Sequence, residues 1–232
     1  LEQYNEMQSK GTIYYDLKFL IDSKISDLFG IKVPNLGDYR AKVGENSLDF
    51  YTNNIFQRVK KLSEQIKFFH WSLEFPQIFY NENGEKKSDA GFDVIIGNPP
   101  FNAQISDEES KFIRAKYPAT ENNSNTAIAF LNLAKNLLKN ECFLGFVIPK
   151  SIMYSQKWTA ARNFVIDEFT KIIDISKAFE KVLLEQIIII IEKNSNRKHY
   201  DINFLSSEAV CQVDKKLIKS FGMILNDLTT DE

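Results

Sequence analysis

The sequence predicts an α/β protein with a mainly parallel sheet and a pair of helices before it. From Phe92 onward, short apolar segments alternate with helical segments, which is typical of a sheet covered on both faces. Before about residue 70, apolar residues instead recur at steps of three and four, which is typical of amphipathic helices. The chain has 232 residues, 44% of them hydrophobic and 26% charged, so it can bury the core of one such domain.

The N-terminal part, residues 1–69, is predicted to form a helical hairpin. One apolar stripe runs through residues 12–29 and a longer one through residues 47–69. The intervening residues 30–46 contain one proline and several glycines, which indicates a loop. We interpret this hairpin as a structural appendage of the following domain.

Residues 70–200 are predicted to form the sheet and its helices. Strands are expected at residues 92–97, 143–148, 171–175 and 186–191. Helices are expected at 125–138 and around Trp158, Ala161, Val165 and Phe169. The long polar segment 102–124 is interpreted as a mobile lid that holds a short helix at 107–116. After Lys193 we expect a strand, a short helix and a loose tail, and residues 201–232 are interpreted as the weakly patterned start of a following region.

Composition argues against several classes of protein. The longest apolar run, at residues 186–191, is too short to cross a bilayer, and no basic-then-apolar leader opens the chain. Cys142 and Cys211 form no metal-binding spacing, so we expect a reduced cytoplasmic protein without a metal site. The net charge is −2, whereas a free-standing DNA-binding protein usually shows a basic stripe. If the chain works on DNA, most of the contacts with the DNA phosphates must come from outside this chain.

The tetrapeptide Asn98-Pro99-Pro100-Phe101 is the strongest candidate for a functional site. It follows the strand that ends at Gly97, and open α/β sheets bind ligands beyond the carboxyl ends of their strands. Two prolines fix the backbone and remove two N–H donors, so the turn presents carbonyl oxygens. The asparagine adds an amide oxygen, and the aromatic ring can stack on a flat group. The set is suited to a planar amine.

Such an amine is a poor nucleophile because its lone pair is delocalised into the ring. Two acceptors on its two hydrogens favour a tetrahedral nitrogen whose lone pair can attack an electrophilic methyl group. This is preorganised electrostatic stabilisation, and it requires no strong general base.

Several segments resemble motifs of the amino-methylating, S-adenosylmethionine-dependent methyltransferases. Phe-Asp-Val-Ile-Ile-Gly-Asn-Pro-Pro-Phe, at residues 92–101, resembles the fourth motif of that family. Residues 125–131, 146–149 and 177–179 are similar to later motifs. The family usually carries a tyrosine where Ala127 stands, which puts any contact made through that ring in question.

Residues 69–79 narrow the resemblance to a subfamily. This segment, Phe-His-Trp-Ser-Leu-Glu-Phe-Pro-Gln-Ile-Phe, resembles one typical of bifunctional type IIG restriction–modification enzymes. His70 within it is expected to be structural, since no metal partner is in view. The resemblance implies a cytoplasmic, adenine-N6-specific methyltransferase that acts on double-stranded DNA.

The resemblance also implies roles for individual residues. Asn98 and Pro99 would accept hydrogen bonds from the amine of a flipped adenine, with Pro100 completing the rigid turn. Phe101 and Phe179 would stack on the two faces of the base, although Phe179 could equally be a core aromatic between strands. The methyl donor would be S-adenosylmethionine, which Asn98 would touch only at its margin.

The same resemblance implies a partial Rossmann-like methyltransferase sheet, corresponding to strands 4 to 7 of the family. Only nine glycines occur, and no two have the spacing of a Gly-x-Gly turn that would bind the cofactor. We therefore expect the cofactor half before Leu1 and the target-recognition half after Glu232, and we expect the chain alone to be inactive. The strand at 92–97 would then be an exposed apolar edge that self-associates or is covered by the hairpin.

Two alternatives remain open. An Asn-Pro-Pro-aromatic turn also occurs in enzymes resembling protein glutamine-N5 and RNA guanine-N2 methyltransferases, whose substrates pose the same lone-pair problem. A non-catalytic scaffold or DNA-binding module that keeps the fold is the second alternative, supported by the missing glycine-rich turn. A nucleotide-binding α/β protein is disfavoured because the sequence has no phosphate loop.

Overall fold

The computed structural model describes residues 13–33, 54–101, 103–120, 125–176, 184–205 and 207–224. The chain divides into two compact units, Leu1–Gly84 and Glu85–Glu232. Within the described ranges, no helix is both long enough and apolar enough to span a membrane.

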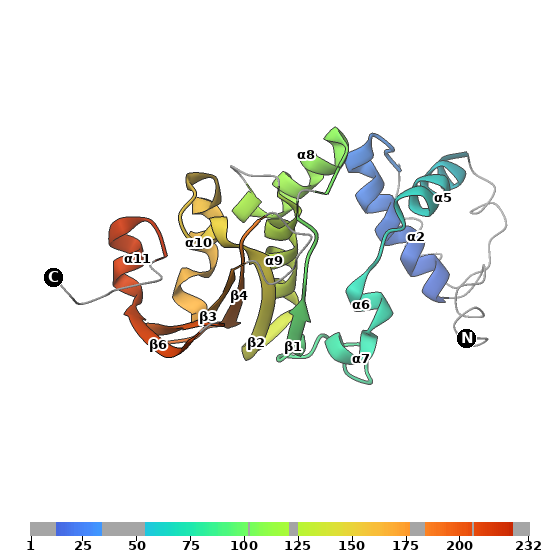
Figure 1. Ribbon diagram of the computed structural model, residues 1–232. Helices are drawn as coiled ribbons and strands as arrows, with labels where there is room; N and C mark the ends of the chain where they lie inside the picture. Colours follow the sequence, from blue (N-terminus) through green and yellow to red (C-terminus); the bar gives the residue numbers. More distant parts are fainter. Residues whose placement is uncertain are drawn as a thin grey trace. The chain divides into compact units, whose positions relative to one another are not determined.

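The first unit contains the two predicted helices (Figure 1). Its elements are α2 (Ile13–Ser26), η1 (Asp27–Phe29), α5 (Asn54–Ile66), α6 (Trp71–Glu74) and α7 (Pro76–Phe79). Phe19 of α2 packs on Phe56 of α5, with ring centroids 4.4 Å apart, and Val59 completes this small core. The second helix ends at Ile66, earlier than the predicted residue 69, and residues 47–53 lie outside the described part of the chain.

A buried polar network ties the segments of this unit together. His70 Nε2 lies 2.6 Å from Asp22 Oδ1, and Ser63 Oγ donates to Asp22 Oδ2 over 2.7 Å. Lys18 Nζ donates to the same Oδ2 over 2.8 Å. Burial alone would raise the pKa of Asp22, but the hydrogen bonds from His70, Lys18 and Ser63 hold this pKa below its usual value. His70 therefore links the chain before α6 to α2, which agrees with its expected structural role.

The second unit contains a six-stranded mixed sheet (Figure 1). The strands lie in the order β1-β2-β4-β3-β5-β6. β1 and β2 are parallel, as are β3 and β5, whereas β4 and β6 run antiparallel to their neighbours. Their bounds are β1 (Phe92–Gly97), β2 (Leu138–Pro149), β3 (Phe169–Ser176), β4 (Gln186–Glu192), β5 (His199–Phe204) and β6 (Ser207–Asp214). The predicted α/β class is confirmed, and the single strand expected after Lys193 is an antiparallel pair, β5 and β6.

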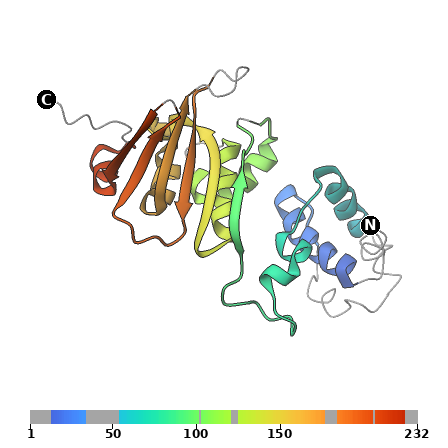
Figure 2. The same ribbon diagram turned by 60° about the horizontal axis from the view of Figure 1, so that its bottom comes forward.

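The main core lies between one face of the sheet and the helices α9 (Thr126–Leu137), α10 (Thr159–Val165) and α11 (Lys215–Phe221). Figure 2 shows these helices behind the sheet. Phe146, Ile189, Ile172 and Ile202 stand beside one another in register across four strands, and each is buried. Because side chains alternate between faces along a strand, this row directs the same face of each strand towards the helices.

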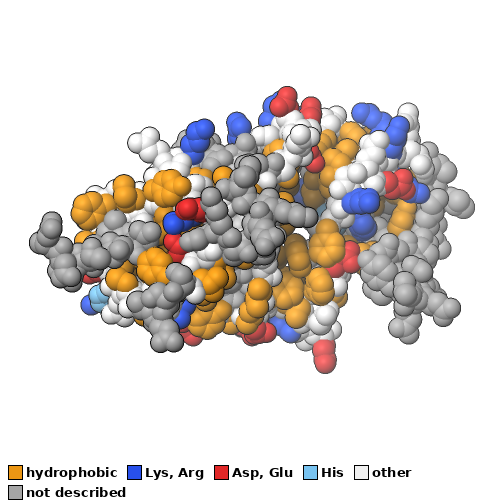
Figure 3. Space-filling view, in the orientation of Figure 1, with side chains coloured by type: hydrophobic (Ala, Val, Ile, Leu, Met, Phe, Trp, Pro, Cys, Tyr) orange, Lys and Arg blue, Asp and Glu red, His pale blue; other side chains and the backbone are white. Residues whose placement is uncertain are grey.

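The opposite face of β1 and β2 is exposed, which corrects the expectation of a sheet buried on both faces. Val94 is 56%, Ile96 83% and Phe143 41% exposed. Figure 3 shows hydrophobic side chains at the surface over this region. The strand at 92–97 forms as predicted, and it is the outermost strand of the sheet, as expected. Its burial on both faces is not observed, because only one face packs against the main core. The self-association expected from this edge stays a prediction.

Two further helices were predicted from the sequence. The helix predicted at 107–116 is present as α8 (Asp107–Lys116), which begins with a capping box between Ser106 and Glu109. It is followed by η2 (Pro118–Thr120), where Thr120 is fully buried. The helix predicted to include Phe169 ends at Val165, because Phe169 is the first residue of β3 and pairs with Ile191.

The polar network predicts a pH-dependent stability of the helical unit. Asp22→Asn should lower the free energy of unfolding at neutral pH by about 1.5 to 3 kcal/mol, because a buried carboxylate loses its charge-assisted hydrogen bonds. The lowered pKa of Asp22 means that this contribution is present above pH 3.8 and is lost as the pH falls through the folded-state pKa. Urea unfolding followed by Trp71 fluorescence, in a Trp158→Phe background, measures it. A difference between the two proteins that stays constant down to pH 2 would contradict the assignment.

Candidate functional site

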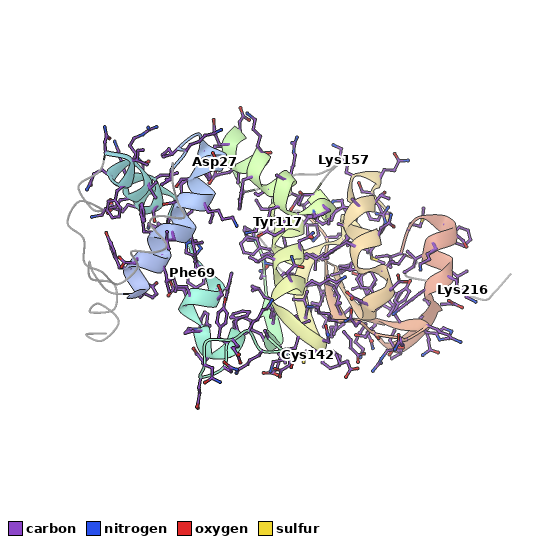
Figure 4. The ribbon with its side chains drawn as sticks, turned by 180° about the vertical axis from the view of Figure 1, so that it is seen from behind. Asp27, Phe69, Tyr117, Cys142, Lys157 and Lys216 are labelled. Atoms are coloured by element: carbon purple, nitrogen blue, oxygen red, sulfur yellow. The ribbon has the colours of Figure 1, made fainter. Side chains whose placement is uncertain are left out.

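The carboxyl ends of three strands meet at one edge of the sheet. β1 ends at Gly97, β2 at Pro149 and β3 at Ser176, and the antiparallel β4 begins there at Gln186. In Figure 4, Lys157, which follows the end of β2, lies at this edge, whereas Cys142, near the beginning of β2, lies at the opposite one. The structure therefore places the predicted tetrapeptide at the edge where α/β sheets bind ligands.

The tetrapeptide forms a turn that is half anchored and half exposed. Pro99 is buried and Phe101 is half-buried against the main core, whereas Asn98 and Pro100 are exposed. The anchored residues hold the turn, and the exposed amide of Asn98 is accessible to a ligand.

Thr126, at the start of α9, fixes the backbone of this turn. Its Oγ1 donates to the carbonyl oxygen of Pro100 over 2.7 Å and accepts from the backbone N–H of Ala103 over 3.3 Å. Thr126 is 5% exposed, so water competes little for these hydrogen bonds. Asn125 caps the same helix by accepting from the backbone N–H of Ala127 over 2.9 Å.

This clamp leaves two acceptors of the turn unused. Within the described ranges, no residue hydrogen-bonds the side-chain amide of Asn98 or the carbonyl oxygen of Pro99. Thr126 takes the Pro100 carbonyl and leaves the acceptors on Asn98 and Pro99 for a ligand. These are the two residues for which the sequence predicted that role.

Gly97 lets the strand pass close to an aromatic ring just before the turn. A Cβ atom at this position would meet Cε1 of Phe146 at 3.0 Å, and Phe146 is itself 5% exposed. The glycine therefore allows β1 to approach β2 at the place where the turn begins.

A second polar group at the same edge was not predicted. Lys150 Nζ lies 2.8 Å from Asp174 Oδ2 and 3.2 Å from Glu185 Oε2, and its backbone N–H donates to the Glu185 carbonyl. Burial alone would lower the pKa of Lys150, but the hydrogen bonds to Asp174 and Glu185 raise it. An aspartate inside the apolar run Ile-Ile-Asp-Ile was the available signal, because a buried charge requires a partner.

Phe179 and Ala127 are two further positions that the resemblance singled out. Phe179 lies outside the described residues, so its predicted stacking role is untested. Ala127 is 1% exposed in the main core, and no tyrosine ring occupies that position. In the part of the chain that the structure describes, no group of three His, Cys, Asp or Glu side chains is placed to hold a metal ion.

The close approach at Gly97 gives a testable consequence. Gly97→Ala should lower the free energy of unfolding by about 1 to 3 kcal/mol, because the new methyl group crowds a buried ring. Gly145→Ala is the matched control, since a Cβ there meets nothing within 4 Å. Chemical denaturation of the three proteins measures the difference. The double variant Gly97→Ala/Phe146→Leu should recover part of the loss, and equal effects of the two single alanine substitutions would contradict the steric explanation.

The chain is similar to a known protein family and to a known protein. A family model described as Eco57I restriction-modification methylase matches residues 10–180, more than half of the chain. A protein of Methanocaldococcus jannaschii is 33% identical to this chain over 108 residues. Its name describes it as a type II restriction enzyme and methyltransferase. That match covers 47% of this chain but only 8% of the relative, so the chain spans a small part of the relative's length.

Two solved structures are also similar. One belongs to a type I restriction–modification system, with a TM-score of 0.51 and 14% identity over 61% of this chain and 38% of that one. It shares the α/β fold. The other, the type IIG restriction endonuclease BpuSI, is 16% identical, with a TM-score of 0.46, and the match covers 90% of this chain and 31% of that protein. Together with the turn at the sheet edge, the family match gives one conclusion. The chain belongs to the Eco57I restriction-modification methylase family.

Proposed function

We propose that this chain carries the base-binding part of the active site of an S-adenosylmethionine-dependent methyltransferase, which methylates adenine N6 in double-stranded DNA within a restriction–modification system. The observation that carries this proposal is the Asn98–Phe101 turn at the carboxyl edge of the sheet, with two acceptors left unused by Thr126. Membership of the Eco57I methylase family supports methyl transfer as the reaction and DNA as the partner.

In the proposed mechanism, Asn98 Oδ1 and the carbonyl oxygen of Pro99 accept the two hydrogens of the adenine amine. A nitrogen held in this way becomes tetrahedral, and its lone pair is no longer delocalised into the ring. The backbone that carries both acceptors is fixed in place before the substrate arrives, because Pro99 is buried and Thr126 holds Pro100. The reaction therefore needs little reorganisation of the site as charge develops on the nitrogen.

Aromatic residues would hold the ring of the base outside the DNA stack. Phe101 is half-buried against the core, so one face of its ring is supported by the protein and the rest can contact a flat base. Phe179 is proposed to contact the other face. Stacking on two sides compensates for part of the cost of removing the base from the duplex.

The residues of this chain do not fit the whole of an S-adenosylmethionine site. The bound cofactor would supply an electrophilic methyl group, but no Gly-x-Gly turn occurs in the sequence, and Asn98 is the single residue that we assign to its margin. We propose that the remainder of the same polypeptide supplies the cofactor site and most of the contacts with DNA. A net charge of −2 agrees with this division of roles.

The test of the proposal is methyl transfer by the full-length protein to duplex DNA, followed by mass spectrometry of the product nucleosides. Asn98→Ala should lower kcat roughly 100- to 1000-fold, the loss expected when one preorganised polar contact is removed. Asn140→Ala should leave kcat unchanged, because this exposed asparagine lies near the beginning of β2, at the edge of the sheet opposite to the Asn98 turn.

Three other results of this assay would change the proposed function. Equal transfer by Asn98→Ala would remove Asn98 from the mechanism. Methylated guanine in RNA or methylated glutamine in protein, together with unmethylated DNA, would support the corresponding alternative function instead. Absence of transfer by the wild-type protein to any of these substrates would favour a scaffold module.

Thr126 is predicted to be a positioning residue. Thr126→Val keeps the shape of the side chain but cannot donate to the Pro100 carbonyl, so kcat should fall roughly 10- to 100-fold through misplacement of the turn. Thr126→Ser keeps the hydroxyl and should retain most of the activity. The KM for S-adenosylmethionine should change little in either variant. A Thr126→Ser variant as impaired as Thr126→Val would contradict the hydrogen-bond explanation.

A further inference from the structure

A cationic hollow lies at the edge of the sheet opposite to the Asn98 turn. It has a volume of about 340 Å³ and is formed by three segments that are distant in the sequence. Asp167 lies just before β3, Arg197 and Lys198 lie just before β5, and the third segment begins with Asp214 at the end of β6. Since β3 and β5 begin here, the hollow is at the amino edge of these strands, away from the carboxyl edge that carries Asn98.

Backbone and side-chain contacts hold the three segments together. The backbone N–H of Lys215 donates to the Lys198 carbonyl over 2.9 Å. The ammonium group of Lys215 donates to the main-chain carbonyl of Asp167 over 2.6 Å, and Lys219 forms an ion pair with the Asp167 carboxylate at 2.7 Å. The shape of the hollow is therefore set by the fold, and it does not depend on loose surface side chains alone.

Positive charge in the hollow exceeds negative charge, although the chain as a whole carries −2. Five cationic side chains line it, namely Arg197, Lys198, Lys215, Lys216 and Lys219, against the carboxylates of Asp167 and Asp214. The Asp167 carboxylate is already engaged by Lys219, and the Asp214 carboxylate accepts the backbone N–H of Lys216. Arg197 is paired with Glu192 at 3.1 Å.

Two exposed cations of the hollow have no carboxylate partner. The side chains of Lys198 and Lys216 are exposed, and neither forms an ion pair with any residue in the described ranges. Figure 4 shows Lys216 on α11, well separated from Lys157. Unpaired cations around one hollow attract an anion, because several charges act on it together.

Lys215 adds a buried positive charge to the same place. It is 6% exposed, and its ammonium group donates to a neutral main-chain carbonyl and forms no ion pair with a carboxylate within the described residues. Burial lowers the pKa of this lysine, with the charge of Asp167 acting in the opposite direction. An anion in the hollow would stabilise the charged form of Lys215.

We propose that this hollow binds an anion bearing phosphate groups, with Lys198 and Lys216 donating to its oxygens and Lys215 supplying a fixed charge beneath them. Several acceptor oxygens arranged around one centre suit several ammonium donors better than a single carboxylate does. The phosphate could belong to a small free compound or to the backbone of a nucleic acid, and the experiment separates these sources. The site is separate from the Asn98 turn, so it does not depend on the proposed methyltransferase activity.

The test is isothermal titration of the 232-residue chain with pyrophosphate at constant ionic strength. Binding by the wild type is expected, and Lys198→Gln/Lys216→Gln should weaken it roughly tenfold or more, since two charge-assisted hydrogen bonds are lost. Lys157→Gln is the matched control, because it removes an exposed lysine outside the hollow, and its affinity should equal that of the wild type. Both altered lysines are exposed, so the double variant should remain folded, which circular dichroism checks.

A second arm identifies the source of the phosphate. Displacement of pyrophosphate by a short DNA duplex, lost in the double variant, would assign the hollow to a nucleic-acid backbone. Binding of pyrophosphate that the duplex does not displace would assign it to a free phosphate compound. Failure of the wild type to bind pyrophosphate, or equal binding by wild type and double variant, would overturn the proposal.

Discussion

The position of the candidate site depends on the apolar row that crosses the sheet beneath the helices. Phe146, Ile189, Ile172 and Ile202 belong to four different strands, and each is buried in register with its neighbour. A slip of one residue in any strand would turn its apolar set to the opposite face, so the packing against α9, α10 and α11 fixes the register. Because the register is fixed, the ends of β2 and β3 meet at one edge, and β1 ends beside them because Gly97 pairs with Phe146.

The Thr126 hydrogen bond transfers this order to the turn that follows β1. Thr126 begins α9, and α9 contributes Ile128 and Leu131 to the same core as Phe146. The hydroxyl that holds the Pro100 carbonyl is therefore on an element that is itself held by the sheet. Pro99 cannot donate a hydrogen bond, and its buried ring prevents the turn from relaxing into solvent. A turn held in this way has preorganised acceptors.

The sequence was informative where local chemistry decides the structure. The alternation of strands and helices, the helix at 107–116 with its Ser106 cap and the turn at Asn98 all follow from patterns within a few residues. Features that depend on distant partners were missed. The Lys150–Asp174 pair joins the residue that follows β2 to one on β3, and the boundary at Phe169 depends on its pairing with Ile191. The edge position expected for residues 92–97 is confirmed, but burial of both faces was wrong there, because an apolar run does not show that only one face of a strand is covered.

The two edges of the sheet differ in the chemistry that they offer. At the carboxyl edge, the positive charge of Lys150 is balanced by Asp174 and Glu185, and the unused groups are the neutral acceptors of Asn98 and Pro99. Neutral acceptors favour an amine and give little attraction for a phosphate. At the amino edge, the unused groups are the cations of Lys198 and Lys216, which favour a phosphate and reject an amine. The same net charge of −2 therefore conceals two places with opposite preferences. Since the two places lie at opposite edges of one sheet, the sheet keeps them apart, and a phosphate at one edge need not compete with a base at the other.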